Sequence, residues 1–240
     1  MKHVVEDSFI NDLEIYHDIQ PIINLNNNKV IGYEFLLRSK NVKSPEALFS
    51  YAMEKNKLYD LDIKSIFKVI GSIQNQSAKL ENILLFINVF PSTLTEVNFY
   101  NCLLNTLSVI NIKPESVVLE INEAEKGLNI SVFKEAISKY KKQGFVISLD
   151  DIGKGESTIK AIIEIEPNIA KVDRYFSKDL ASSPKKQEII KHLLLFFGKE
   201  TTMVLEGIEN MKDLSIAKKL GVPLGQGFYF GKPKPFDYLL

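Results

Sequence analysis

Acidic and amide side chains stand at the ends of several apolar runs in this chain. One run leads into Glu34, a second ends in Asn88, a third ends in Glu120, and a fourth ends in the adjacent pair Asp150 and Asp151. Carboxylates and amides offer hard oxygen ligands, the kind that suits Mg²⁺ or Mn²⁺. The spacing therefore points to chemistry that uses a divalent cation.

Later runs continue the pattern. They carry Lys171, Glu206 and Gln226, and Asp173 follows Lys171 by two residues. Carboxylates that meet in one place repel one another unless a cation neutralises them. We expect one or two bound ions of Mg²⁺ or Mn²⁺, because two adjacent carboxylates could let one bridge two metals while the other serves the second. Each residue alone could be a helix cap, a turn former or a solvated side chain, so the interpretation depends on their shared position.

Eight short apolar runs could form the strands that position these residues. They are continuously apolar, as expected of strands that are covered on both faces, and helical patterns separate most of them. The runs are Ile19–Leu25, Val30–Leu37, Leu84–Val89, Val117–Ile121, Phe145–Leu149, Ile169–Val172, Met203–Leu205 and Leu224–Phe230. Helices are predicted from Ser44, over Asp62–Gln76, Val132–Gln143, Glu188–Phe197 and Met211–Leu220, and after the glycines at 153 and 155.

The first two runs are joined by a short turn at residues 26–28, so those two strands should be antiparallel. The other connections contain helices and imply parallel strands. The pattern predicts an α/β fold, a TIM-like (β/α)8 barrel with one antiparallel strand. In such a barrel the strand ends converge on one face, where active sites are built.

Length and composition limit the functions open to the chain. It has 240 residues, of which 45% are hydrophobic, and 30 basic residues balance 30 acidic ones. A neutral chain lacks the positive field expected of a protein that binds nucleic acid polymers or anionic lipid. We expect an extension at residues 1–15 and one barrel domain at 16–240. The lone Cys102 excludes a disulfide framework and a cysteine-based zinc site and, beside two leucines, suggests a buried thiol. No apolar run or signal core indicates a membrane span or export, so we expect a cytoplasmic protein.

The run around Glu34 resembles a known signature. Residues 32–38 read GYEFLLR, which is similar to the GYEALLR of bacterial EAL domains. Further matches in family order lie at residues 20–22, 87–91, 119–123, 149–153, 170–174, 205–209 and 226–228. The resemblance covers nearly the whole chain. It implies a TIM-like barrel and a role as a cyclic-di-GMP phosphodiesterase or as an inactive, sometimes ligand-binding, descendant.

The resemblance also implies a role for each matching residue. The first metal would be held by Glu34, Asn88, Glu120 and Asp150, and the second by Asp150, Asp151 and Glu206. Lys171 would position or activate the attacking water, and Gln226 would lie beside it. The substrate would be bound by Gln20 at a guanine edge, Arg38 at a phosphate, Asp173 and Gln226. Glu123 would anchor the loop after Asp151. Arg38 and Arg174 are the chain's two arginines, and both fall in these motifs.

The sequence departs from the family most clearly after Asp151. Where the family has DFGTGYSS, this chain has Ile152, Lys154 and Glu156 in place of the Phe, Thr and Tyr. Phe35, Ser39 and Asn122 are smaller departures. Every implied metal ligand is present, but the loop that supports the second metal is altered.

Two functions stay open from the sequence. The first is metal-dependent hydrolysis of cyclic-di-GMP to linear pGpG, in which water attacks one phosphorus in line while cations neutralise the growing charge. The second is a weak or inactive domain that binds cyclic-di-GMP without turnover. A scaffold that binds no ligand fits poorly with a complete ligand set, and an enolase-type enzyme would need a separate capping domain. A homodimer and a separate regulatory protein are further expectations, since no sensory or cyclase domain is seen.

Overall fold

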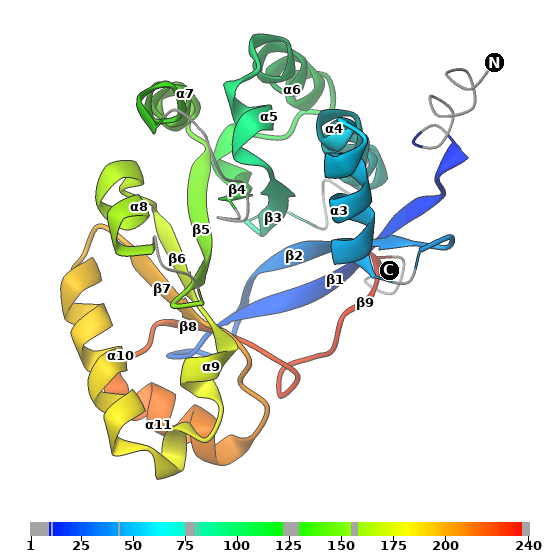
Figure 1. Ribbon diagram of the computed structural model, residues 1–240. Helices are drawn as coiled ribbons and strands as arrows, with labels where there is room; N and C mark the ends of the chain where they lie inside the picture. Colours follow the sequence, from blue (N-terminus) through cyan, green and yellow to red (C-terminus); the bar gives the residue numbers. More distant parts are fainter. Residues whose placement is uncertain are drawn as a thin grey trace.

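The computed structural model describes residues 10, 12–42, 44–74, 80, 82–121, 130–154 and 158–236. Nine strands form one sheet, in the order β2-β3-β4-β5-β6-β7-β8-β1-β9, and β1 also pairs with β2, so the first eight strands close into a barrel (Figure 1). The strands are β1 (Ile15–Asn24), β2 (Val30–Ser39), β3 (Leu84–Val89), β4 (Val117–Ile121), β5 (Val146–Ile152), β6 (Ile169–Val172), β7 (Thr202–Leu205), β8 (Leu224–Gln226) and β9 (Lys234–Pro235).

The closure of the barrel depends on one reversed strand. β1 is antiparallel to both of its neighbours, β2 and β8, whereas β2 through β8 are parallel. The turn between β1 and β2 has Asn28 in the left-handed region (φ 59°), which asparagine tolerates. The predicted barrel with one antiparallel strand is therefore confirmed.

Several strand boundaries differ from the prediction, and the largest differences are at β1 and β8. β1 begins at Ile15 instead of Ile19, because its antiparallel pairing continues outward until Ile15 lies opposite Ser39. β8 ends at Gln226, since Gly227 takes a positive φ of 153° and lies so close to the Ile208 backbone that a Cβ would not fit. The short β9, which pairs with Asp18 and Ile19, was not predicted.

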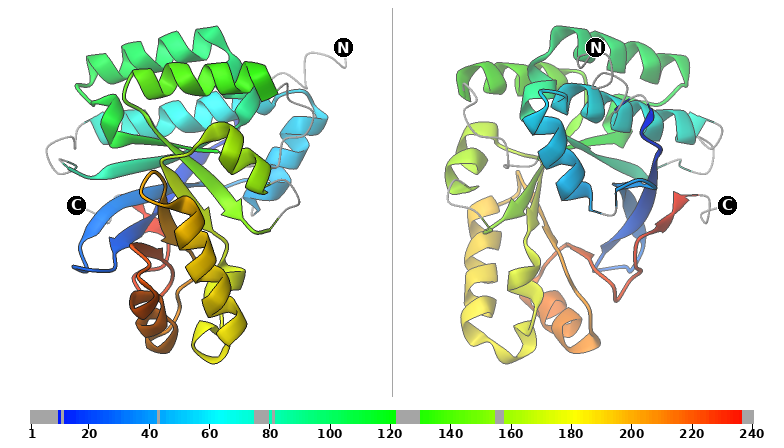
Figure 2. Two further views of the ribbon diagram at one scale, coloured as in Figure 1. Left: turned by 90° about the vertical axis from the view of Figure 1, so that its left-hand side faces the viewer. Right: turned by 45° about the vertical axis from the view of Figure 1, so that its right-hand side comes forward.

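Helices surround the strands. Figure 2 shows α5 to α7 and α10 to α11 on opposite sides of the barrel. The helices are α3 (Pro45–Glu54), α4 (Leu58–Ile73), α5 (Pro91–Thr95), α6 (Val97–Val109), α7 (Ile130–Lys142), α8 (Thr158–Ile165), α9 (Arg174–Ser177), α10 (Pro184–Phe197) and α11 (Met211–Leu220). The Ser44 side chain caps α3 by accepting from the Ala47 amide, as its sequence predicts.

Helix α6 was missed, although Phe99, Leu103 and Leu107 recur every four residues and are all buried. The same helix corrects the expectation for Cys102. Its thiol is exposed, because it lies one position before the buried Leu103 and so points away from the barrel. None of the helices in the described part of the chain is long and apolar enough to cross a bilayer.

The barrel interior is filled by an apolar layer, called here the plug. It consists of Ile22, Phe86, Val118, Ile169, Val204 and Leu224. Gly32 is required beside it, because a Cβ at this position would lie 2.6 Å from the Leu84 carbonyl and 2.8 Å from the Phe86 ring. The plug closes the barrel beneath the strand ends, so the polar residues above it face an apolar floor.

A smaller apolar cluster lies at the start of the chain. Ile10 and Leu13 are buried and pack with Leu37, Leu48 and Leu61. These two side chains belong to the segment that the sequence suggests as an extension. The division into residues 1–15 and 16–240 stays a proposal.

A buried histidine should make the stability of the fold depend on pH. His17 on β1 is 8% exposed, and its Nε2 lies 2.9 Å from the Ser65 hydroxyl. Burial lowers the pKa of His17 to about 4, with smaller effects from Lys68 and Arg38. Below pH 6.5 the unfolded chain therefore binds a proton that the folded protein does not, so stability falls as pH falls from about 6.5 to about 4.

We expect wild type to lose about 2 kcal/mol more stability between pH 7 and pH 5 than a His17→Gln variant. Urea unfolding at the two pH values measures the difference. His192→Gln serves as the control, because His192 is exposed and should leave the pH dependence unchanged. Equal pH dependence in wild type and His17→Gln would contradict the prediction.

Candidate active site

The two-residue periodicity of strands places one polar side chain next to the plug residue of each of six strands, on the open side of the barrel. Residues two apart on a strand point to the same face. Each plug residue therefore has a polar neighbour on its open side, and in chain order these are Gln20, Asn88, Glu120, Lys171, Glu206 and Gln226. Glu34 and Asp150 stand in the same way above Gly32 and Ser148. The strand-end cluster is the name used here for Glu34, Asn88, Glu120, Asp150, Asp151, Lys171, Glu206 and Gln226.

The Lys171 ammonium lies at the centre of this cluster. Its Nζ is 2.9 Å from Glu206 Oε1, 3.3 Å from Glu34 Oε2 and 3.3 Å from Asp150 Oδ1, and it donates a hydrogen bond to Glu120 Oε1. The Lys171 side chain is 1% exposed. One buried cation thus holds carboxylates from four different strand ends together.

Burial and neighbouring charges both shift the pKa values of groups in the cluster. Burial alone would lower the pKa of Lys171, but the surrounding carboxylates, Asp150 foremost, raise it well above its ordinary value. Burial also raises the pKa of Glu120 well above normal, with Glu34 adding to the effect. The pKa of Glu206 is raised to about 8, again mainly by burial. Additional positive charge beside Glu120 and Glu206 would therefore stabilise their ionised forms.

The side chains fit a divalent cation. Ligand atoms of Asp150, Asp151 and Glu206 lie within 4.8 Å of one another. Glu120 Oε2 and Gln226 Oε1 are buried and have no hydrogen-bond partner among the described residues, so oxygens of the cluster are left for another ligand. All the candidate metal-ligand atoms are carboxylate or amide oxygens, which Mg²⁺ and Mn²⁺ prefer.

An irregularity in β5 brings the two adjacent aspartates to the same mouth. Neighbouring residues of a regular strand point to opposite faces. The β5–β6 register shifts between Leu149 and Ile152, and Asp151 takes a left-handed conformation with φ 56°. Asp151 Oδ2 also pairs with Lys154 Nζ at 2.8 Å. The altered loop therefore places a lysine directly on one of the proposed metal ligands.

Two amides orient Glu34. Gln226 Nε2 donates to Glu34 Oε2 at 2.6 Å and also lies 3.3 Å from Gln20 Oε1, and Asn88 Nδ2 donates to Glu34 Oε1 at 3.5 Å. Gln20 in turn donates to the Gly231 carbonyl. These bonds link the two sides of β1, because Glu34 and Gln226 come from the strands that flank it.

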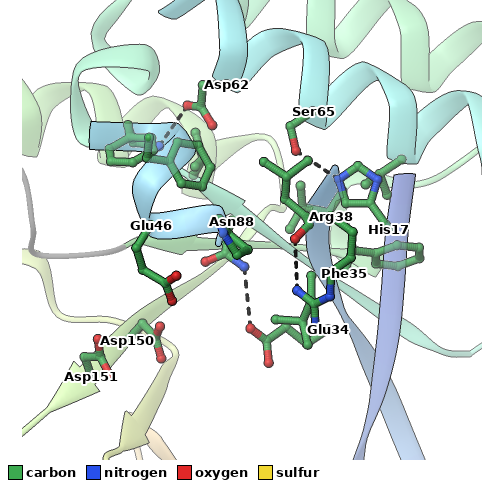
Figure 3. A pocket seen from close by; sticks show the side chains of 18 of the residues that line it. His17, Glu34, Phe35, Arg38, Glu46, Asp62, Ser65, Asn88, Asp150 and Asp151 are labelled. Carbon is green, nitrogen blue, oxygen red and sulfur yellow. Dashed lines mark hydrogen bonds between the residues drawn. The ribbon is translucent and has the colours of Figure 1, made fainter. Parts of the chain in front are cut away.

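A cavity of about 550 Å³ opens beside the cluster. Its polar wall includes Glu34, Asn88, Asp150 and Asp151, and Arg38 lines it farther along β2 (Figure 3). The rest of the wall is largely apolar and includes an edge-to-face pair of Phe49 and Phe90 with centroids 5.0 Å apart. A cavity of this size with an apolar wall and a charged end suits a ligand that has both aromatic rings and phosphates.

Some residues with implied roles lie apart from the cluster or outside the described part of the chain. The Asp173 side chain caps α9 by accepting from the Tyr175 amide at 2.8 Å. Glu123 and Glu156 lie outside the described residues. Gln20 is buried within the hydrogen-bond network of Glu34 and Gln226.

Sequence reasoning missed two aspartates that support the site. Asp18 pairs with Arg38, and it was overlooked because the first strand was predicted to begin at Ile19. Asp62 on α4 is 2% exposed and accepts from the Phe90 amide at 2.9 Å, which holds the chain just after Asn88. The second contact joins residues 28 positions apart, and no local signal would reveal it.

The EAL domain family model matches residues 5–233 of the chain. The probable cyclic di-GMP phosphodiesterase PdeI of Escherichia coli is 30% identical over 231 residues, which are 93% of this chain and 29% of PdeI. The cyclic di-GMP phosphodiesterase RocR of Pseudomonas aeruginosa is 26% identical, over 95% of this chain and 59% of RocR. The chain thus spans only part of the length of these relatives.

Solved structures share the fold. A standalone EAL protein from Vibrio cholerae in its c-di-GMP-bound form has a TM-score of 0.84 and 28% identity, and the match covers 94% of each chain. The calcium and cyclic-di-GMP complex of BlrP1 from Klebsiella pneumoniae has a TM-score of 0.81 and 24% identity, covering 91% of this chain and 55% of that one.

Proposed function

The chain belongs to the EAL domain family, and on that premise we propose that it is a metal-dependent phosphodiesterase that hydrolyses cyclic di-GMP to linear pGpG. The observation that carries the proposal is the strand-end cluster, in which Lys171 meets four carboxylates at the open end of the barrel. The names of PdeI and RocR support the substrate class.

The cluster divides into two sets of ligands for Mg²⁺ or Mn²⁺. Glu34, Asn88, Glu120 and Asp150 would hold one ion, and Asp150, Asp151 and Glu206 would hold a second. When bound, such ions polarise a phosphodiester oxygen and lower the pKa of water. With all five carboxylates ionised, the cluster and Lys171 together carry a formal charge of −4, which two divalent ions would cancel. An anionic phosphodiester could then approach without repulsion.

The remaining residues bind and orient. The Lys171 ammonium donates to the attacking water or to a phosphoryl oxygen, where it offsets the charge that grows as the P–O bond breaks. Gln226 keeps Glu34 in place, and its amide lies beside Lys171's partners. Arg38 offers its guanidinium to a phosphate, and Gln20 offers a buried amide to a guanine edge. Roles for Asp173 as a substrate contact and for Glu123 as a loop anchor remain proposals, as do a homodimer and a separate regulator.

Product analysis tests the function. Purified protein is incubated with cyclic di-GMP and Mg²⁺ or Mn²⁺, with and without a chelator. Appearance of pGpG that the chelator abolishes supports the proposal. Binding of cyclic di-GMP without product would favour the second candidate, a binding domain whose altered loop after Asp151 fails to assemble the ions. If the protein neither binds cyclic di-GMP nor forms product, both candidate functions are overturned.

The ion pair between Lys154 and Asp151 should weaken the second metal. Lys154 Nζ occupies an oxygen of a proposed ligand, and its charge repels a cation at that place. We expect Lys154→Thr to lower the half-saturating concentration of Mn²⁺ or Mg²⁺ for turnover by about three- to tenfold. Wild type should work better with Mn²⁺ than with Mg²⁺, since Mn²⁺ demands less regular geometry.

Metal titrations of turnover measure this effect. Lys160→Thr is the matched control, because Lys160 is an exposed lysine on α8 outside the cluster. The triple change Ile152→Phe, Lys154→Thr and Glu156→Tyr should extend the gain by restoring the family's loop. An unchanged or weaker metal response in these variants would mean that the loop has been re-optimised with its own contacts.

A further inference from the structure

Arg38 is held in place before any substrate arrives. Its Nε donates to Asp18 Oδ2 at 2.8 Å, and its Nη1 donates to the Leu37 carbonyl at 2.9 Å. The Arg38 and Asp18 side chains are 27% and 16% exposed. The neighbouring pair Lys40–Glu14, just beyond the ends of the same two strands, is 70% and 64% exposed. The Asp18–Arg38 pair is therefore partly withdrawn from water and less screened than a surface ion pair.

The antiparallel register explains how the two residues meet. Tyr16 lies opposite Arg38, and Asp18 lies opposite Leu36, so Asp18 and Arg38 are diagonal neighbours across β1 and β2. Gln20 and Glu34, which lie directly opposite each other, are two and four residues away on the same face. Asp18 and Arg38 thus lie on the same face of the β1–β2 hairpin as Gln20 and Glu34, but farther along the strands, beyond the strand-end cluster.

The contacts leave a defined part of the guanidinium for a ligand. Arginine has five N–H donors, of which one is on Nε and two are on each Nη. Asp18 accepts from the Nε donor, and the Leu37 carbonyl accepts from one of the two Nη1 donors. Among the described residues, three donors are left without a hydrogen bond, one on Nη1 and two on Nη2, and Arg38 lines the cavity beside the cluster. This is the fork that binds two oxygens of a phosphate.

We propose that Asp18 is a positioning residue, which fixes the Arg38 guanidinium for the phosphate of the dinucleotide that is not being cleaved. The proposal rests on the proposed function. Arg38 lies four positions after Glu34 on an extended strand, a Cα distance of about 13 Å, so Arg38 reaches the part of the substrate remote from the reacting phosphorus. Such a contact is equally strong in the ground state and the transition state, so losing it raises KM and leaves kcat unchanged.

Steady-state kinetics on Asp18 variants test the role. Asp18→Ala should raise the KM for cyclic di-GMP about tenfold and change kcat less than twofold. Asp18→Asn should restore most of the affinity, because its amide oxygen can still accept from Nε. A Kd for cyclic di-GMP measured with Ca²⁺, the ion in the BlrP1 complex, should follow the KM values. Glu14→Ala is the matched control and should leave KM unchanged.

A double-variant cycle separates positioning from a general structural effect. If Asp18 acts through Arg38, adding Asp18→Ala to Arg38→Ala should not raise KM further. An additive increase, an unchanged KM in Asp18→Ala, or tighter binding in both Asp18 variants would each overturn the inference. The last result would mean that Asp18 mainly weakens the positive charge of the cavity. If wild type neither binds nor cleaves cyclic di-GMP, the proposed function fails instead.

Discussion

Replacing Lys171 with alanine should lower kcat for cyclic di-GMP hydrolysis by about a hundredfold or more, while substrate binding persists. The ammonium lies where four strand-end carboxylates meet, so it is next to any phosphodiester bound at this mouth. Its charge matters most in the transition state, when negative charge on the phosphoryl oxygens is greatest. The expected signature is a loss in kcat with little change in the Kd for the dinucleotide.

The same variant should behave differently with and without divalent ions. In the absence of metal, Lys171→Ala leaves buried carboxylates such as Glu120 without a cation, which destabilises the fold by about 3–5 kcal/mol. Saturating Mn²⁺ should recover most of that stability, because the ions replace the lost positive charge. Thermal unfolding with Mn²⁺ and with a chelator measures the recovery.

Lys160→Ala provides a control for the loss of a lysine from the surface. If Lys171→Ala keeps wild-type kcat at saturating metal, the lysine has no part in the reaction. If it loses kcat but is equally stable with and without Mn²⁺, the ions do not take over the charge of Lys171.

Glu34→Ala should remove metal binding and turnover together. Glu34 is 6% exposed, and its two oxygens are held by Gln226 and Asn88, so its position is defined before a cation binds. Loss of an oriented ligand should cost several kcal/mol of transition-state stabilisation, a decrease in kcat of about a thousandfold. Equilibrium dialysis with Mn²⁺ should show the loss of one bound ion.

Glu135→Ala is the matched control, since Glu135 is an exposed glutamate on α7 that pairs with Lys139. Comparison with Lys171→Ala separates metal binding by Glu34 from the part that Lys171 has in the reaction, because Lys171→Ala should lose kcat and keep its metal. Full occupancy by Mn²⁺ in Glu34→Ala would remove Glu34 from the ligand set, whatever its turnover.

Local sequence determined the barrel and the membership of the strand-end cluster. Continuously apolar runs identified the strands, and the short asparagine turn identified the reversed one. Glu120 and Asn88 could be recognised because each ends a run and stands two residues after a plug residue, Val118 or Phe86. Period-two alternation and the common direction of parallel strands are local properties, and they were enough to bring these residues to one face.

Tertiary structure alone decided which partners each residue meets. Lys171 lies among four carboxylates because the closed barrel brings the ends of four other strands within reach of its side chain. Asp18 reaches Arg38 only because β1 and β2 pair farther outward than their apolar residues indicate. Asp62 supports the chain after Asn88 from a separate helix. Such contacts join residues that are 20 or more positions apart, and their geometry depends on the packing of the whole barrel, which no local pattern encodes.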